Sequence, residues 1–157
     1  YSASTQETEK LVAAMKITLE ERLPSAEVTP QQLKDRSWWT GPDIFLIVDN
    51  LDLVADMAFA PLLSVLPHAR DVGLHVVITR KSGGCVRALF QPFLAEIKDQ
   101  SPFIIVLDAD KDDGPLFGVR LKPQPPGRGV MIHHGTQQGL IQIAAADMQE
   151  ATEAKAS

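Results

Sequence analysis

Long apolar runs mark the expected strands of this chain. Five apolar residues stand together at 44–48, and further runs rich in β-branched residues lie at 74–79 and 103–107. Unbroken apolar runs of this length are typical of strands that are buried on both faces of a parallel sheet. We therefore expect an α/β fold whose central sheet is parallel.

Apolar residues spaced three and four apart mark the expected helices. The first helix is predicted to begin at Ser4, which has the spacing of a capping box with Glu7, and to end before Pro24. Its apolar face consists of Leu11, Met15, Leu19 and Leu23. A second, short helix is predicted after Thr29, because Pro at the next position favours the first turn of a helix.

Two longer amphipathic segments follow. A helix opening near Pro61 should be kinked or divided at Pro67, and a helix capped by Ser82 should kink at Pro92. The buried face predicted for the first is Phe59, Leu62, Leu63, Leu66 and Val72. The buried face predicted for the second is Val86, Leu89, Phe90, Phe93, Leu94 and Ile97.

The order of these elements predicts the topology. Strand, helix and strand between residues 44 and 79 form a βαβ unit, whose strands should be parallel and whose crossover should be right-handed. Residues 130–133 and 140–144 are expected to form a C-terminal β-hairpin. We expect one domain over residues 1–144 and a polar tail over 145–157.

The strand at 44–48 leads directly into an acid, Asp49. Open α/β sheets bind ligands at the carboxyl ends of their strands, and in nucleotide hydrolases an acid there holds Mg²⁺ against the phosphates. The run 43–50 therefore has the form of a Walker B motif. Its partner, G-x-x-x-x-G-K-[ST], is absent, because Lys81-Ser82-Gly83-Gly84 has the right residue types in the wrong order. The chain holds half of a nucleotide site, or none.

Composition narrows the classes of function. The 157 residues suffice for one domain with a real core, and the net charge of −5 argues against a nucleic-acid groove. The single cysteine, Cys85, excludes an internal disulfide and fits a reducing compartment. No apolar segment approaches the ~18 residues of a membrane span, and no secretory leader is visible. The chain begins at Tyr1, and we expect it to be a piece of something longer.

Several motifs, taken in order, resemble one family. They are Ser37-Trp38-Trp39-Thr40-Gly41-Pro42, the run 67–77, Arg80-Lys81-Ser82-Gly83-Gly84 with Arg87-Ala88-Leu89-Phe90, and Pro126-Gly127-Arg128-Gly129. Over about residues 7–144 they resemble the EccC ATPases of actinobacterial type VII (ESX) secretion, which belong to the FtsK/SpoIIIE branch of P-loop ATPases. EccC proteins carry three tandem ATPase domains, and this segment is most similar to the C-terminal half of the last one.

The resemblance implies that the P-loop and its strand lie N-terminal to these residues. In an FtsK/RecA-like sheet that strand runs between the strands that correspond to 74–79 and 103–107. The chain would then lack the middle of its own sheet and leave two strand edges unpaired, which is an aggregation liability. ATP and Mg²⁺ would bind only together with the missing half, so the chain by itself should not turn over ATP.

The resemblance also implies roles for single residues. Asp49 would hold Mg²⁺ through water, unless it only caps the loop after the strand. Asn50 stands where many relatives have an acid that polarises the attacking water, and because an amide cannot accept a proton, we expect weak or absent hydrolysis. Asp52 would partly substitute for that acid or cap the following turn. Thr79 matches a polar sensor position that contacts the γ-phosphate, although Thr is common at strand ends.

Three arginines are further candidates for nucleotide binding. Arg80 and Arg87 would present a guanidinium group to a phosphate of this site or of a neighbouring domain, or they would form ordinary surface salt bridges. Arg128, between two glycines, would approach the nucleotide base or a neighbouring subunit.

Other conspicuous side chains are expected to be structural. His75 should be a satisfied core or interface residue, and His133 and His134 should point to opposite faces of a strand. No set of His, Cys, Asp and Glu has ligand spacing, so no structural metal is predicted. Trp38 and Trp39 should seal the core where the chain joins the sheet.

These observations leave several functions open. By resemblance, the chain is part of a hexameric motor at the cytoplasmic face of the inner membrane, within a secretion complex, and recognises C-terminal signals of small helical secreted proteins. Asn50 favours an alternative, a non-hydrolysing binding or assembly module. A DNA translocase like FtsK is disfavoured by the acidic balance, and a free-standing Rossmann-like enzyme by the lack of a glycine-rich fingerprint.

Overall fold

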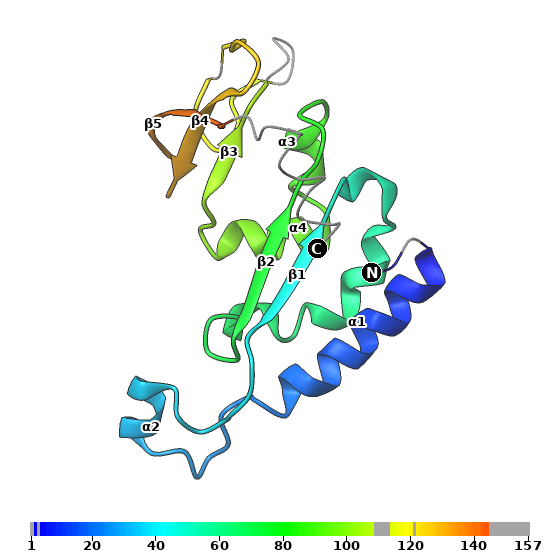
Figure 1. Cartoon of the computed structure of the whole chain (residues 1–157), viewed down its shortest axis with the longest axis vertical. Helices are drawn as coiled ribbons and strands as arrows, with labels where there is room; N and C mark the ends of the chain where they lie inside the picture. Colours follow the sequence, from blue (N-terminus) through cyan, green and yellow to red (C-terminus); the bar gives the residue numbers. More distant parts are fainter. Residues whose placement is uncertain (1, 3, 109–113, 121, 145–157) are drawn as a thin grey trace, which may run out of the picture. The chain divides into compact units, whose positions relative to one another are not determined.

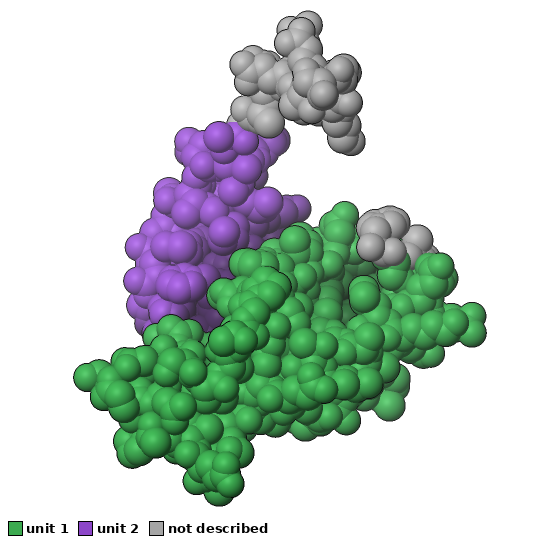
Figure 2. Space-filling view, turned by 60° about the horizontal axis from the view of Figure 1, so that its bottom comes forward, with its two compact units in different colours: residues 1–81, 87–100 green, residues 82–86, 101–157 purple. Residues whose placement is uncertain are grey.

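The chain folds into two compact units. The computed structural model describes residues 2, 4–108, 114–120 and 122–144. One unit comprises residues 1–81 and 87–100, and the other comprises residues 82–86 and 101–157 (Figure 2). The polar tail predicted from residue 145 and most of the acidic loop after the third apolar run lie outside the described residues.

The first unit is built on a pair of parallel strands. Strands β1 (Ile44–Val48) and β2 (Leu74–Ile78) run side by side in the same direction (Figure 1). Ile44 is level with Leu74, and Val48 is level with Ile78. The parallel pair predicted from the two apolar runs is therefore confirmed.

The segment between these strands is not the α-helix that its spacing predicts. It forms short 3₁₀ helices, η1 (Leu51–Leu53), η2 (Asp56–Leu62) and η3 (Leu66–His68). Pro61 lies inside η2 and Pro67 lies in the first turn of η3, and because proline has no amide hydrogen, neither can donate to a continuous helical ladder. The burial prediction holds better, since Phe59, Leu62, Leu66 and Val72 are all buried and Leu63 is partly buried.

Helix α1 (Thr5–Glu20) begins as predicted. The Ser4 hydroxyl accepts a hydrogen bond from the Glu7 amide at 3.3 Å. Leu19 is buried as predicted, and Met15 and Leu23 pack partly buried against the core. The predicted apolar face is wrong at Leu11, which is 48% exposed, because the helix turns Val12 into the core instead. Helix α2 (Pro30–Asp35) has the predicted Thr29 cap, reinforced by the Gln32 side chain.

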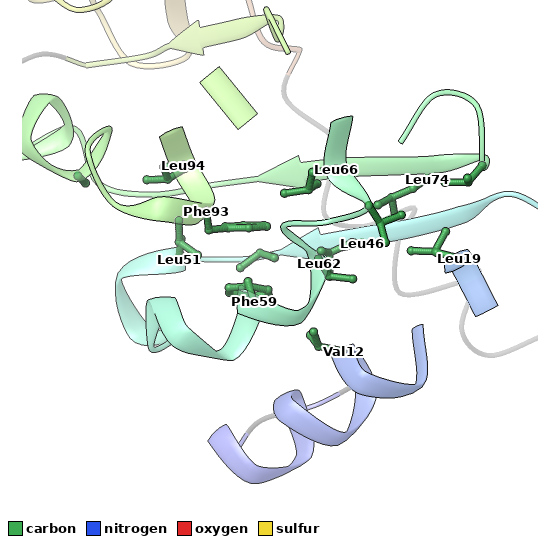
Figure 3. Packing of buried hydrophobic residues seen from close by; sticks show 14 residues of the cluster. Val12, Leu19, Leu46, Leu51, Phe59, Leu62, Leu66, Leu74, Phe93 and Leu94 are labelled. Carbon is green, nitrogen blue, oxygen red and sulfur yellow. The ribbon is translucent and has the colours of Figure 1, made fainter. Parts of the chain in front are cut away.

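The core of the first unit lies on one face of the β1–β2 pair. Helix α1 and helix α4 (Pro92–Asp99) both pack against η2. Within this core the rings of Phe59 and Phe93 stack with their centroids 4.4 Å apart. Figure 3 shows the buried side chains gathered between the sheet and α1.

The helix predicted from Ser82 onward is two helices. Helix α3 (Cys85–Ala88) stops early, and Pro92 starts α4 instead of kinking a continuous helix, because proline is favoured in a first turn and excluded from an interior. Phe93 and Leu94 are buried as predicted, but Phe90 lies in the break and is 79% exposed. The prediction was wrong for Phe90.

The second unit is an antiparallel sheet in the order β3-β4-β5. Its strands are β3 (Ile104–Val106), β4 (Arg128–His133) and β5 (Thr136–Gln142). The predicted C-terminal hairpin is confirmed, with longer strands and a two-residue loop. His134 and Gly135 form that loop with φ angles of 50° and 67°, as a primed hairpin turn requires.

The described strands do not form one continuous sheet. Strands β1 and β2 pair only with each other among the described residues, and β3 pairs with β4, antiparallel. This agrees with the expected gap between the strands at 74–79 and 103–107. One prediction was wrong for the described chain: β1 is not buried on both faces, since Phe45 and Ile47 are 62% and 69% exposed. The reason is that the described residues make only an incomplete parallel sheet. The α/β class, the incomplete sheet and the hairpin are as expected.

The histidines also differ from expectation. His75 is exposed, so the core alternative was wrong for the described chain, while the interface alternative stays a prediction. Its Nε2 lies 3.2 Å from Asp43 Oδ2, and its ring stacks on Phe45. The ring centroids of His133 and His134 lie 3.9 Å apart, so the two side chains do not point to opposite faces of a strand. The reason is that β4 ends at His133 and His134 lies in the hairpin turn, with a φ of 50°. No helix in the described part of the chain is both long and apolar enough to cross a membrane.

Candidate functional site

The candidate site lies where β1 and β2 end. Because the two strands are parallel and in register, Asp49 and Thr79 leave the sheet at the same edge. The Thr79 hydroxyl donates a hydrogen bond to Asp49 Oδ1 at 2.8 Å. The same hydroxyl oxygen accepts a hydrogen bond from the backbone amide of Asn50 at 2.9 Å. The Thr79 side chain thus joins the residue after β2 to the two residues after β1.

Backbone bonds continue the ladder past the strands. The Thr79 amide donates to the Val48 carbonyl at 2.9 Å, and the Leu51 amide donates to the Thr79 carbonyl at 2.8 Å. Thr79 is therefore bonded through its amide, its carbonyl and its hydroxyl, and its position is set by β1 and the turn that follows it.

Asn50 occupies an unusual backbone conformation. Its φ and ψ are 58° and 72°, in the left-handed region, where Asn is among the non-glycine residues that fit best. Its Oδ1 atom is buried and finds no hydrogen-bond partner among the described residues. The side-chain oxygen of Asn50 therefore does not face solvent in the described structure.

Asp52 and Arg80 form an ion pair beside this junction. Arg80 Nη2 lies 2.8 Å from Asp52 Oδ1, and the Lys81 amide donates to Asp52 Oδ2 at 3.0 Å. Both carboxylate oxygens of Asp52 are thereby occupied, so Asp52 joins the turn after β1 to the turn after β2. A hollow lies next to the pair, lined by Leu51, Asp52, Val54, Asp56, Arg80, Ala88 and Gln91.

The other two predicted arginines are not part of this group of contacts. The Arg87 side chain in α3 is exposed and makes no hydrogen bond or ion pair within the described residues. Arg128 is exposed at the start of β4, in the second unit. Nucleotide-binding roles for Arg80, Arg87 and Arg128 remain predictions.

Asp49 fits one role in a magnesium site. Its carboxylate is exposed, and Oδ2 makes no hydrogen bond to any residue that the structure describes. Mg²⁺ is commonly held by one or two carboxylates, by waters and by substrate phosphates. Across residues 2, 4–108, 114–120 and 122–144, no three His, Cys, Asp or Glu side chains gather as a metal centre. The donors present thus suit an acid that acts through the metal's water shell, with further ligands from outside these residues.

Sequence reasoning missed a buried arginine. Arg22 is only 8% exposed, donates from Nη1 to the Val72 carbonyl at 3.1 Å, and lies over the Trp39 ring with Cζ 4.3 Å from the centroid. The indole nitrogens of Trp38 and Trp39 donate to the carbonyls of Arg22 and Asp71. Both tryptophans are partly buried and anchored ahead of β1. That they seal the core stays a prediction. A signal existed, since two adjacent tryptophans need partners for their N–H groups and often stack on a cation.

Comparison with known proteins places this geometry in a family. No protein-family model matches the chain. The ESX-4 secretion system protein EccC4 of Mycobacterium tuberculosis is 46% identical over 130 residues, which are 80% of this chain and 10% of that protein. The ESX secretion system protein EccC of Thermomonospora curvata is 43% identical over 148 residues, which are 92% of this chain and 11% of that protein.

Solved structures agree with the sequences. The cytoplasmic domain of the type VII secretion ATPase EccC of T. curvata superposes with a TM-score of 0.86 at 40% identity, covering 94% of this chain and 18% of that one. The chain belongs to the EccC family. It spans about one tenth of the length of the two EccC relatives compared above. The predicted resemblance to type VII secretion ATPases of FtsK/SpoIIIE type is therefore confirmed.

A second T. curvata structure contains EccC ATPases 2 and 3 in complex with a signal sequence peptide. It superposes with a TM-score of 0.83 at 40% identity and covers 94% of this chain. The placement of our chain in the last ATPase domain stays a prediction.

Proposed function

We propose that this EccC segment supplies the Mg²⁺ side of an ATP site in the motor of type VII protein secretion. The observation that carries the proposal is Asp49, an exposed carboxylate at the carboxyl end of a parallel strand, held by Thr79 through one oxygen only. The phosphate side of the site comes from the polypeptide that carries the P-loop. Bound Mg²⁺ would neutralise charge on the nucleotide phosphates.

The experiment compares two carboxylates of the same strand in the full-length protein. Asp49 follows β1 and Asp43 precedes it, and both are exposed. We expect Asp49→Asn to remove the part of Mg²⁺-dependent ATP-analogue binding that belongs to this site, because an amide carries no charge. Asp43→Asn should leave that part unchanged. Equal binding by the parent protein and by Asp49→Asn would refute the proposal.

A second function, nucleotide binding without hydrolysis, is favoured by Asn50. The amide cannot act as a base, and its oxygen is buried. The Asp49→Asn variant separates the two functions, since its steady-state ATPase rate is measured beside its binding. Loss of binding with an unchanged rate supports a non-hydrolysing site. Loss of both supports a catalytic one.

We further infer that the segment contributes to the recognition of secretion signals. Support comes from the T. curvata EccC structure that holds a signal sequence peptide. In this proposal the partners are small helical secreted proteins with C-terminal signals, and the motor works as a hexamer in a membrane-associated secretion complex, on the cytoplasmic side. A cross-linkable signal peptide from a substrate of the same system should label residues 1–144 in the full-length protein. Labelling confined to other domains would contradict this.

A further inference from the structure

The hydrogen bonds of Thr79 limit what its hydroxyl can do. A threonine hydroxyl has one proton and two lone pairs. The proton is donated to Asp49 Oδ1 at 2.8 Å, and one lone pair accepts the Asn50 amide at 2.9 Å. A hydroxyl in this arrangement has no proton left for a phosphate oxygen. Contact with a γ-phosphate as a donor would require it to release Asp49.

The surroundings of Thr79 hold it in this arrangement without any ligand. Its amide and carbonyl are bonded to Val48 and Leu51, and the residues after it are tied to Asp52 through the Arg80 guanidinium and the Lys81 amide. All of these contacts lie within the first unit and connect the ends of β1 and β2. A sensor side chain has to switch between two arrangements when its ligand binds. The amide, the carbonyl and the hydroxyl proton of Thr79 are all held in hydrogen bonds to the residues that end β1 and follow it.

We propose that Thr79 is a positioning residue for Asp49 and is not a sensor of the γ-phosphate. Its hydroxyl fixes the carboxylate through Oδ1 and leaves Oδ2 as the oxygen available to the water shell of the metal. Outer-shell partners of metal-binding carboxylates commonly change metal affinity by about 10- to 100-fold when removed. The inference rests on the proposed function, because it concerns the same Mg²⁺–ATP site.

The test measures the Mg²⁺ dependence of ATP-analogue and ADP binding in full-length protein. The signal of this site is the part of binding that Asp49→Asn removes. Thr79→Val should raise the Mg²⁺ concentration at half-saturation by about tenfold or more, equally for both nucleotides, because no phosphate contact is lost. Thr79→Ser, which keeps the hydroxyl, should restore it to within about twofold. Thr136→Val, at an exposed threonine of β5, is the control and should change nothing.

Three outcomes decide between the possibilities. A Thr79→Val variant that loses affinity for the ATP analogue but not for ADP, at unchanged Mg²⁺ half-saturation, is a sensor variant and overturns the inference alone. Unchanged Mg²⁺ dependence for both nucleotides overturns it as well. If the parent shows no binding that depends on Asp49, the proposed function fails and this inference fails with it.

Discussion

Asn50 shows how a single backbone conformation limits the choice of side chain. The φ of Asn50 is 58°, and at this angle the Cβ atom of most residues lies too close to the following carbonyl oxygen. Gly has no Cβ, and Asn and Asp tolerate the conformation better than other residues. Asn50 is thus one of the residues that fit this conformation, and its backbone amide donates a hydrogen bond to the Thr79 hydroxyl. Asn therefore suits the conformation of this turn, whatever effect the absence of an acid has on hydrolysis.

We predict that Asn50→Asp destabilises the junction and does not create an efficient ATPase. The new carboxylate would replace a buried, unpartnered oxygen beside Asp49, which should cost about 1–3 kcal/mol. Hydrogen exchange of the Asn50 and Leu51 amide positions in the full-length protein measures this cost as lost protection. Asn50→Gly is the control: it keeps the left-handed turn, removes the orphaned oxygen and should stay within about 1 kcal/mol of the parent. Full protection together with faster hydrolysis in Asn50→Asp would contradict the prediction.

The site was partly predictable at this scale. Asp49 and Thr79 follow apolar runs that were expected to be parallel, so their proximity followed from the pattern. The pairing of Asp52 with Arg80 did not, because no periodicity relates two turn residues 28 positions apart. The buried Arg22 was missed for the same reason: its partners, Val72 and Trp39, come from distant segments.

At the scale of elements, prolines and glycines account for most differences from the periodic pattern. The division near Pro67 was among the predicted outcomes, but the 3₁₀ geometry of both pieces was not. At Pro92 a kink was predicted, and the structure has a break between two helices. Spacing predicts which residues are buried more reliably than which hydrogen-bond ladder they adopt, because 3₁₀ and α geometry both bring residues three and four apart to nearby positions. Among the described glycines, Gly73, just before β2, leaves the least room for a Cβ atom.

We predict that Gly73→Ala strongly destabilises the first unit. Gly73 has a φ of +71°, and an added Cβ would lie 2.6 Å from both Asp43 Oδ1 and Trp39 Cη2. Strain and overpacking together should cost about 2–5 kcal/mol. Gly84→Ala, at a glycine of the second unit, is a control for strain alone. Its φ is +70° and a Cβ there would meet no atom of the described residues within 4 Å, so only about 1–2 kcal/mol of strain is expected. Chemical denaturation of the two variants should rank them in this order, and equal costs would contradict the role of the Trp39 contact.

At the scale of the whole molecule, one face of the β1–β2 pair leaves apolar side chains exposed. Phe45, Ile47 and Val77 are each at least half exposed on strands that a complete α/β fold would cover on both sides. Burial of these side chains in a complete sheet stays a prediction. The sequence could not show that β3 pairs with β4, because a short apolar run does not identify its partner strand.

We predict that the 157-residue chain by itself associates in solution. Apolar patches of this kind drive association when nothing covers them. Replacing both Phe45 and Ile47 by Thr should weaken association by at least about tenfold, measured by size-exclusion chromatography with light scattering over a concentration series. Leu53→Thr removes an apolar side chain outside the strands that is even more exposed, at 80%, and should have little effect. A chain that stays monomeric at every concentration would contradict the prediction.

The cluster of Arg22, Trp38 and Trp39 has a consequence for how members of this family are recognised. The tryptophan pair is among the most conspicuous sequence features of the chain, and its contacts run to Arg22, Asp71 and Val72, ahead of both strands. Asp49 and Thr79 lie at the opposite ends of the same strands. A search keyed on the tryptophans would therefore retrieve proteins that share this way of anchoring a sheet, whether or not they retain a working nucleotide site. Whether such a protein retains a nucleotide site has to be judged from the residues that correspond to Asp49 and Thr79.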